Sequence, residues 1–283
     1  LRAISVLSVI IFHIDKQIFP LGYLGVDLFF VISGYLITKN IIKSYQNNNF
    51  SFIKFYLKRV RRILPALLIV LLFTLIAAVV ILLVADLKKL SESIITSLFF
   101  VSNFYFWITG GYFSTSDELK PLLHLWSLSV EEQFYLFFPI FLILIFKIFK
   151  DLKIRLLSLF IVIVISYWIN IIFISKGHYD PIFFLFPARV WQFGLGGLLA
   201  FFPNLRVRNT YLDSLYLILA FGLIIINFCT TLKGLPAGTL LSIGTVMILF
   251  KIQNEKNILF KFINLKFFIF LGLISYSLYL WHW

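Results

Sequence analysis

Two ionisable residues, Arg2 and His13, lie eleven positions apart in the first apolar segment of the chain, LRAISVLSVIIFHI. On an α-helix they would be about 16 Å apart along the axis. An imidazole can act as a general base or a nucleophile near neutral pH, and a guanidinium can hold an anionic group such as a phosphate. Because ionisable groups in an apolar span are costly, the pair is a candidate site. The structural alternative is an arginine that reaches lipid headgroups from the chain end and a histidine that only bonds to a neighbour.

The composition indicates a membrane protein. The chain is 61% hydrophobic and only 13% charged, a balance that excludes a soluble globular domain. We therefore predict an all-α fold, a polytopic integral-membrane helical bundle, with residues 1–283 forming one membrane domain. The chain starts without Met and stops within an apolar run, so we expect this domain to be incomplete at both ends. The lone Cys229 allows no internal disulfide.

Apolar runs predict about nine membrane spans. Segment 93–108 is a weaker run with scattered Ser, Thr and Asn, and we expect it to be an interfacial or re-entrant helix within a long outer segment, 85–124. The nine predicted spans are 1–14, 22–38, 63–84, 125–146, 156–175, 187–203, 212–229, 236–250 and 265–283.

Basic residues concentrate in four linkers between these runs, 39–62, 147–155, 204–211 and 251–266. The positive-inside rule places all four in the cytoplasm, which predicts a multi-pass protein of the inner (plasma) membrane and excludes a crossing by 93–108. The net charge of +13 is then an orientation signal that faces anionic lipid. Because the basic residues are divided among membrane loops, nucleic-acid binding is a poor alternative.

This orientation brings six ionisable residues into one outer layer of the bundle, which predicts a polar, hydrated cavity rather than a lipid-facing surface. The six residues are His13, Asp27, Glu131, Glu132, Arg189 and His282.

The segment PLLHLWSLSVEEQFYLFFP carries two adjacent carboxylates, Glu131 and Glu132, which point about 100° apart on a helix and cannot do the same job. Ser127 shares a face with Glu131 at i and i+4. One glutamate is expected to face the cavity and to orient His13 or a sugar hydroxyl. The alternative is that both take part in buried hydrogen bonds between helices.

Two other segments carry charged residues that each allow a functional and a structural interpretation. Asp27 is the one charge in GYLGVDLFFVISGYLIT and could serve the site or only accept a hydrogen bond from a neighbouring helix. Arg61 and Arg62 lie in FYLKRVRRILPAL. They either mark a basic inner boundary or attract the phosphates of a cytosolic cofactor.

Six segments together resemble one family. They are RAISVLSVIIFH, GVDLFFVISGYLI, RRILPAL, PLLHLWSLSVEEQFYL with a preceding Tyr-Phe pair, PARVWQFGLGGLLA and SYSLYLWHW, and they cover almost the whole chain. In this order they are similar to the acyltransferase-3 family of integral-membrane O-acyltransferases that act on bacterial surface carbohydrates.

The resemblance implies transfer of an acyl group, usually acetyl from cytosolic acetyl-CoA, to a hydroxyl of an extracytoplasmic glycan. Examples are a lipopolysaccharide, peptidoglycan or exopolysaccharide sugar. The resemblance also implies that His13 is the catalytic residue and that Arg2 contacts the acyl donor. The family bundle usually has about ten spans, so the resemblance implies a tenth span after Trp283. Some members also carry a soluble esterase-like domain, which we expect as a fused or separate partner outside residues 1–283.

With this resemblance, each candidate residue has an expected role. We expect Asp27, Glu131 and Glu132 to assist His13 in catalysis, and Arg61 and Arg62 to join Arg2 at the acyl-CoA. The expected substrate contacts are Trp126, Ser127, Gln133, Arg189 and His282. No metal ligand spacing is seen, and no metal is expected. The competing class is a proton-coupled transporter, which also carries intramembrane ionisable residues.

Overall fold

A computed structural model describes residues 1–110, 120–202, 210–251 and 265–283, and every regular element in these ranges is helical. The helices are α1 (Arg2–Ile14), η1 (Gly22–Leu24), α2 (Gly25–Gln46), α3 (Phe52–Ile81), α4 (Val84–Leu98), α5 (Ser102–Thr109), α6 (Leu125–Ile148), α7 (Leu152–Ser175), α8 (Tyr179–Phe184), α9 (Phe186–Leu199), α10 (Thr210–Cys229), α11 (Thr239–Lys251) and α13 (Lys266–Trp281).

Each predicted span coincides with a helix, and the all-α membrane character is supported. Four of the described helical segments are long and apolar enough to cross a membrane, namely Gly22–Gln46, Phe52–Ile81, Leu125–Ile148 and Leu152–Ser175. Four others are apolar but shorter: Arg2–Ile14, Ser214–Cys229, Thr239–Lys251 and Lys266–Trp281. The structure therefore establishes a helical bundle suited to a membrane, while the count of nine spans stays a prediction.

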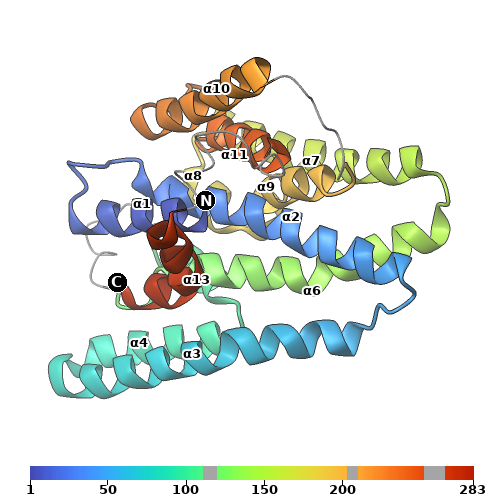
Figure 1. Ribbon diagram of the computed structural model, residues 1–283. Helices are drawn as coiled ribbons and strands as arrows, with labels where there is room; N and C mark the ends of the chain where they lie inside the picture. The colour runs from blue at the N-terminus through green and yellow to red at the C-terminus, as the bar shows by residue number, and fades with distance from the viewer. Residues whose placement is uncertain (111–119, 203–209, 252–264) are drawn as a thin grey trace.

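The connections lie at two opposite ends of the bundle (Figure 1). The α2–α3 and α6–α7 connections lie together at one end, which carries exposed basic residues such as Lys39 and Lys150 and is called the basic end. The α1–α2 and α3–α4 connections lie at the other end, called here the histidine end because α1 ends there one residue after His13.

Segment 93–108 is not one helix, which corrects the sequence prediction. It is divided between α4 and α5, and the chain turns at Phe100, which has a φ of 54°. The hydroxyl of Tyr105 donates to the backbone oxygen of Lys89 at 3.0 Å, so α5 returns antiparallel along α4. Together α4 and α5 form a helical hairpin whose two ends lie on the same side of its turn.

The centre of the bundle is the packing of α9 against α2. A Cβ atom on Gly196 would collide with the backbone oxygen of Val31, and one on Gly34 would collide with that of Phe193. Glycine at both positions lets the two helix backbones touch, as small residues do in membrane helix pairs. This contact fixes α2, and α1 packs on the first turn of α2, so the position of His13 depends on it.

Candidate active site

The histidine end brings three imidazoles together. The ring centroids of His13 and His282 are 4.9 Å apart, and those of His124 and His282 are 5.3 Å apart. Trp283 packs beside them, with its ring 4.5 Å from His13 and stacked on His124 at 5.8 Å. These four residues, named here the imidazole cluster, come from α1, from the residue before α6 and from the end of α13.

The hydrogen bonds of the cluster set the tautomers. His13 Nδ1 lies 2.8 Å from the backbone oxygen of Val9. A carbonyl oxygen can only accept, so this nitrogen carries the proton and Nε2 of neutral His13 carries the lone pair. His282 Nδ1 likewise lies 2.6 Å from the oxygen of Tyr279. Its Nε2 is therefore an acceptor, and it lies 3.3 Å from His13 Nδ1. Both imidazoles thus have the tautomer that leaves Nε2 basic.

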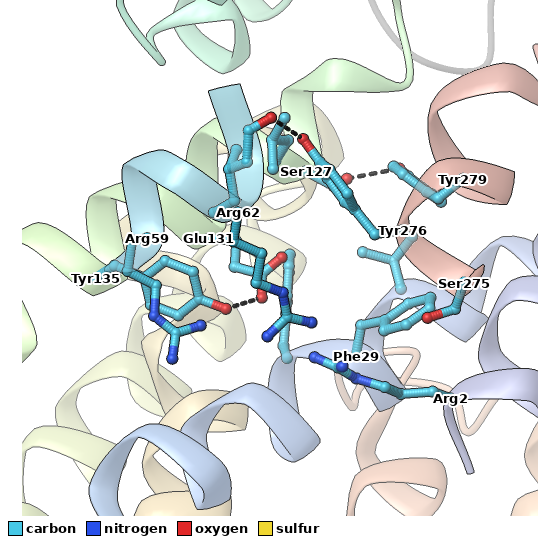
Figure 2. A pocket seen from close by; sticks show the side chains of 14 residues that line it. Arg2, Phe29, Arg59, Arg62, Ser127, Glu131, Tyr135, Ser275, Tyr276 and Tyr279 are labelled. Atoms are coloured by element: carbon cyan, nitrogen blue, oxygen red, sulfur yellow. Dashed lines mark hydrogen bonds between the residues drawn. The ribbon is translucent and has the colours of Figure 1, made fainter. Parts of the chain in front are cut away.

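A second group of side chains lines a separate cavity. A cavity of about 60 Å³ is lined by Arg2, Arg59 and Arg62 together with Glu131, and is called here the arginine cavity. Figure 2 shows Arg2 and Arg62 extending into the same space, with Arg59 beside the ring of Tyr135. The Arg2 Nε atom is buried and has no hydrogen-bond partner among the described residues. Three guanidinium groups thus face one carboxylate, which leaves the cavity with a surplus of positive charge.

Glu131 belongs to this cavity and not to the imidazole cluster. Its carboxylate accepts a hydrogen bond from the hydroxyl of Ser33 at 2.5 Å. It also accepts one from the hydroxyl of Tyr135, which Figure 2 shows. Neither of these partners is an imidazole, which differs from the expectation that a glutamate orients His13. Glu132 does not line the arginine cavity, and its buried Oε1 has no partner among the described residues. The prediction that the two adjacent carboxylates diverge agrees with this arrangement.

The arginines are placed by an extension of α3 that the sequence analysis did not anticipate. The predicted span began at residue 63, whereas α3 starts at Phe52 and continues through Pro65. Arg59 and Arg62 are then i and i+3 on a helix and share a face. Arg61 is exposed and does not line the cavity, although the sequence analysis singled it out and passed over Arg59. The sequence signal that could have identified Arg59 was its spacing of three residues from Arg62.

Helix α13 connects the two groups. The hydroxyl of Tyr279 donates to the backbone oxygen of His124 at 2.9 Å. The same hydroxyl lies 2.5 Å from the hydroxyl oxygen of Ser127 (Figure 2). Tyr276 donates to the oxygen of Ile63 at 2.9 Å. Ser127 lines the arginine cavity with Glu131, as their i and i+4 spacing predicted.

Asp27 and Arg189 form a buried ion pair separate from both groups. Arg189 Nη1 lies 3.0 Å from Asp27 Oδ1, and its Nε donates to the oxygen of Phe183 at 3.0 Å. The guanidinium lies 5.6 Å from the ring centre of Trp126, which is itself buried. The pair ties α2 to α9, and Trp126 packs against it. These three predicted site residues are thus brought together, but away from His13.

Gln133 forms hydrogen bonds that join α6 to the α4–α5 hairpin. Its amide Nε2 donates to the backbone oxygen of Phe100 at 3.0 Å and to Asn103 Oδ1 at 2.9 Å. Ser129, four residues before it, lies 2.7 Å from the hydroxyl of Ser102. This face of α6 therefore fastens the tip of the α4–α5 hairpin, and Gln133 does not line the arginine cavity. Its expected substrate contact has no support from this position.

The described residues include no group of three or more His, Cys, Asp or Glu side chains that could hold a metal ion. Of the six ionisable residues expected in one layer, five are divided among the imidazole cluster, the arginine cavity and the Asp27–Arg189 pair, and Glu132 belongs to none of these groups.

Comparisons with known proteins agree with this architecture. The sequence model of the acyltransferase-3 family, described as an acyltransferase domain, matches residues 1–283. A protein of Staphylococcus aureus (strain COL), provisionally named an O-acetyltransferase, is 35% identical over 296 residues, which cover 100% of this chain and 49% of that protein. O-acetyltransferase OatA of Staphylococcus aureus (strain NCTC 8325 / PS 47) is 32% identical over 304 residues, with the same coverage of 100% and 49%.

A protein of Haemophilus influenzae, named only as uncharacterized, is 40% identical over 183 residues, which cover 63% of this chain and 75% of that protein. No solved structure matches the chain.

The chain belongs to the acyltransferase-3 family and is an acyltransferase domain, as the sequence resemblance predicted. It spans about half the length of the Staphylococcus aureus relatives.

Proposed function

We propose that this domain transfers an acyl group, usually acetyl, from acyl-CoA to a hydroxyl of an extracytoplasmic carbohydrate. The observation that carries the proposal is the placement of two groups on one helix. His13 is at one end of α1 with a basic Nε2, and Arg2 is at the other end with an unpartnered Nε. The helical rise puts them about 16 Å apart, a distance that the extended pantetheine arm of a coenzyme A thioester would have to bridge.

In this mechanism the arginine cavity holds phosphate groups of the donor. Guanidinium groups bind phosphate with two hydrogen bonds each, and Arg2, Arg59 and Arg62 outnumber the one carboxylate beside them. A space of about 60 Å³ holds only a few waters, so the donor enters by displacing side chains that line it. Glu131 orients the arginines through its charge, while the hydroxyls of Ser33 and Tyr135 both donate to its Oε1.

The chemical step takes place at the imidazole cluster. His13 Nε2 removes the proton from the acceptor hydroxyl, and the oxygen attacks the thioester carbonyl. The carbon–sulfur bond breaks, and the thiolate of coenzyme A leaves and takes up a proton. An acyl-His13 intermediate is the alternative route, in which Nε2 attacks first and the hydroxyl then accepts the acyl group. His282 acts as a positioning residue, because its Nε2 shares the Nδ1 proton of His13 with Val9.

The basic end then faces the cytosol and the histidine end faces outward across the plasma membrane. Lysine and arginine in short loops favour this orientation. It brings acyl-CoA to the arginines from the side where it is made, and it brings the glycan to His13 from the other side.

The test uses the purified protein in lipid nanodiscs with radiolabelled acetyl-CoA and the surface polysaccharide of the producing strain. Label should enter the polysaccharide, and one equivalent of free coenzyme A should appear per acetyl group transferred. A proton-coupled transporter would instead move solute in proteoliposomes and leave acetyl-CoA intact, and that result would overturn the proposal.

A further inference from the structure

A larger cavity opens at the histidine end, apart from the imidazole cluster and the arginine cavity. Its volume is about 530 Å³, and its walls come from η1, α7, α8, residues 231–238 and the start of α9, which includes Arg189. It falls within the usual range of small-molecule pockets, roughly 300–1,000 Å³. None of the three clustered histidines lines it. We call it the aromatic cavity.

The walls of the aromatic cavity combine flat rings with polar groups. Tyr23, Tyr179, Phe183 and Trp191 supply rings, and Lys233 supplies an exposed cation at the rim. Trp191 is 2% exposed, and its indole N–H has no acceptor among the described residues. Rings that bury apolar surface beside hydrogen-bonding groups suit a ligand with both an apolar face and hydroxyl groups. A sugar ring has this chemistry.

The cavity borders the predicted reaction centre without containing it. The ring of Tyr23 packs against that of Phe12 at 5.5 Å, and Phe12 contacts the ring of His13 at 4.9 Å. A sugar in the cavity is therefore separated from His13 by two packed side chains, Tyr23 and Phe12, so its own hydroxyls do not reach the imidazole and the reacting hydroxyl belongs to a covalently linked neighbour.

We propose that the aromatic cavity binds a non-reacting sugar unit of the acceptor glycan, adjacent to the unit that receives the acyl group. This inference rests on the proposed function. Binding of a remote part of the substrate positions the reacting part, so a polymer becomes a better acceptor than a single sugar. The cavity thereby selects for chains of sugars.

The test compares two double variants with matched side chains. Tyr179→Ala with Lys233→Ala removes a ring and a cation from the cavity. Trp168→Ala with Lys176→Ala is the control, because neither residue lines the cavity and Trp168 is as exposed as Tyr179, at 62%. Trp191→Phe, which keeps a ring but removes the N–H donor, is a separate variant with a smaller change in the wall.

The first measurement is binding of oligosaccharides from the surface polysaccharide of the producing strain, by saturation-transfer NMR without any acyl donor. We expect the cavity variant to bind at least about tenfold more weakly, Trp191→Phe to bind several-fold more weakly, and the control to match the unaltered protein. This measurement succeeds or fails independently of acyl transfer. Equal binding by all four proteins would overturn the proposal.

The second measurement is acetyl transfer to the polysaccharide and to its single-sugar hydrolysate. The cavity variant should lose transfer to the polymer and keep transfer to single sugars, so that the preference between them falls about tenfold. Equal losses on both acceptors would also overturn the proposal. If the unaltered protein transfers to neither acceptor, the proposed function fails, and the binding measurement still decides the role of the cavity.

Discussion

His13 Nδ1 lies 3.3 Å from His282 Nε2, although the two residues are 269 positions apart in the chain. The contact joins the first helix to the last described one. Because Val9 and Tyr279 fix the protonated nitrogens, the two rings have compatible tautomers, and this geometry supports the proposed role of His282 as a positioning partner of His13.

We expect His282→Ala to lower kcat by about ten- to a hundredfold while the KM for acetyl-CoA stays unchanged, since the arginine cavity is untouched. His282→Gln should restore part of the loss, because a side-chain carbonyl can also accept from His13 Nδ1. His178→Ala is the matched control, since that histidine is exposed and lies outside the cluster. A changed KM with normal kcat would instead indicate a binding role.

His13→Ala should abolish acyl transfer while the protein still inserts into the membrane. Loss of a general base removes about 10²–10⁴-fold of rate, and loss of a nucleophile removes the covalent route altogether. The measurement is product formed per amount of detergent-extracted protein, with His178→Ala alongside. Near-normal product from a well-expressed His13→Ala protein would rule out this mechanism.

The arginine cavity predicts which members of the basic segment hold the donor. Arg59→Ala and Arg62→Ala should each weaken acetyl-CoA binding by about tenfold, as should Arg2→Ala, because each removes a phosphate contact. Arg61→Ala should have no effect, since that side chain is exposed outside the cavity. Calorimetric titration of the four variants measures this. An Arg61→Ala loss as large as the others would mean that charge alone, and not the cavity, attracts the donor.

Gln133→Leu should destabilise the protein without affecting donor binding. The change removes the donor to the oxygen of Phe100 and to Asn103 Oδ1 at the tip of the hairpin, while Asn103 Nδ2 keeps its bond to the oxygen of Phe184. An unsatisfied buried polar group costs about 1–3 kcal/mol, so a lower Tm is expected in nanodiscs. Gln46→Leu at the exposed end of α2 is the control. A normal Tm with lost transfer would return Gln133 to the substrate contacts.

The two ends of the bundle should react with a membrane-impermeant thiol reagent from opposite sides. In a Cys229→Ser background, cysteines at Gln17, Ala85 and Lys176 should be labelled from outside, and cysteines at Asn48 and Asp151 only after the cells are opened. All five positions are exposed. Because α6 and α7 are the two expected crossings between Ala85 and Lys176, labelling of these two positions from opposite sides would contradict the topology.

The apolar runs were sufficient to predict where helices lie, because a helix needs apolar side chains both where it packs in the bundle and where it faces lipid. They could not predict that α3 begins at Phe52, since the basic residues before residue 63 resemble a loop in hydropathy alone. Helix length decided which arginines share a face, and so Arg59 was missed. The turn at Phe100 was also missed, because α4 and α5 together have the length of one weak span.

The histidines show a second limit of the sequence. His13 stood out from its position in an apolar span, but no local pattern could pair it with His282, and His124 lay in a recognised motif without an evident role. Contacts between residues so distant in the chain depend on how helices pack. The grouping of Asp27 with Arg189, and of Glu131 with the arginines, depends on packing for the same reason.

Helix α13 also has a consequence for how the domain is made. Chains emerge from the ribosome N-terminal part first, so the helices that carry Arg2, His13, Arg59 and Arg62 enter the membrane before α13. Until α13 arrives, His13 has no His282, and the arginine cavity lacks Tyr276 and Tyr279 from its wall. A nascent chain can therefore have affinity for anions before it has a competent imidazole. Under the proposed mechanism, a domain without α13 would bind the acyl donor but would not yet position His13 for transfer.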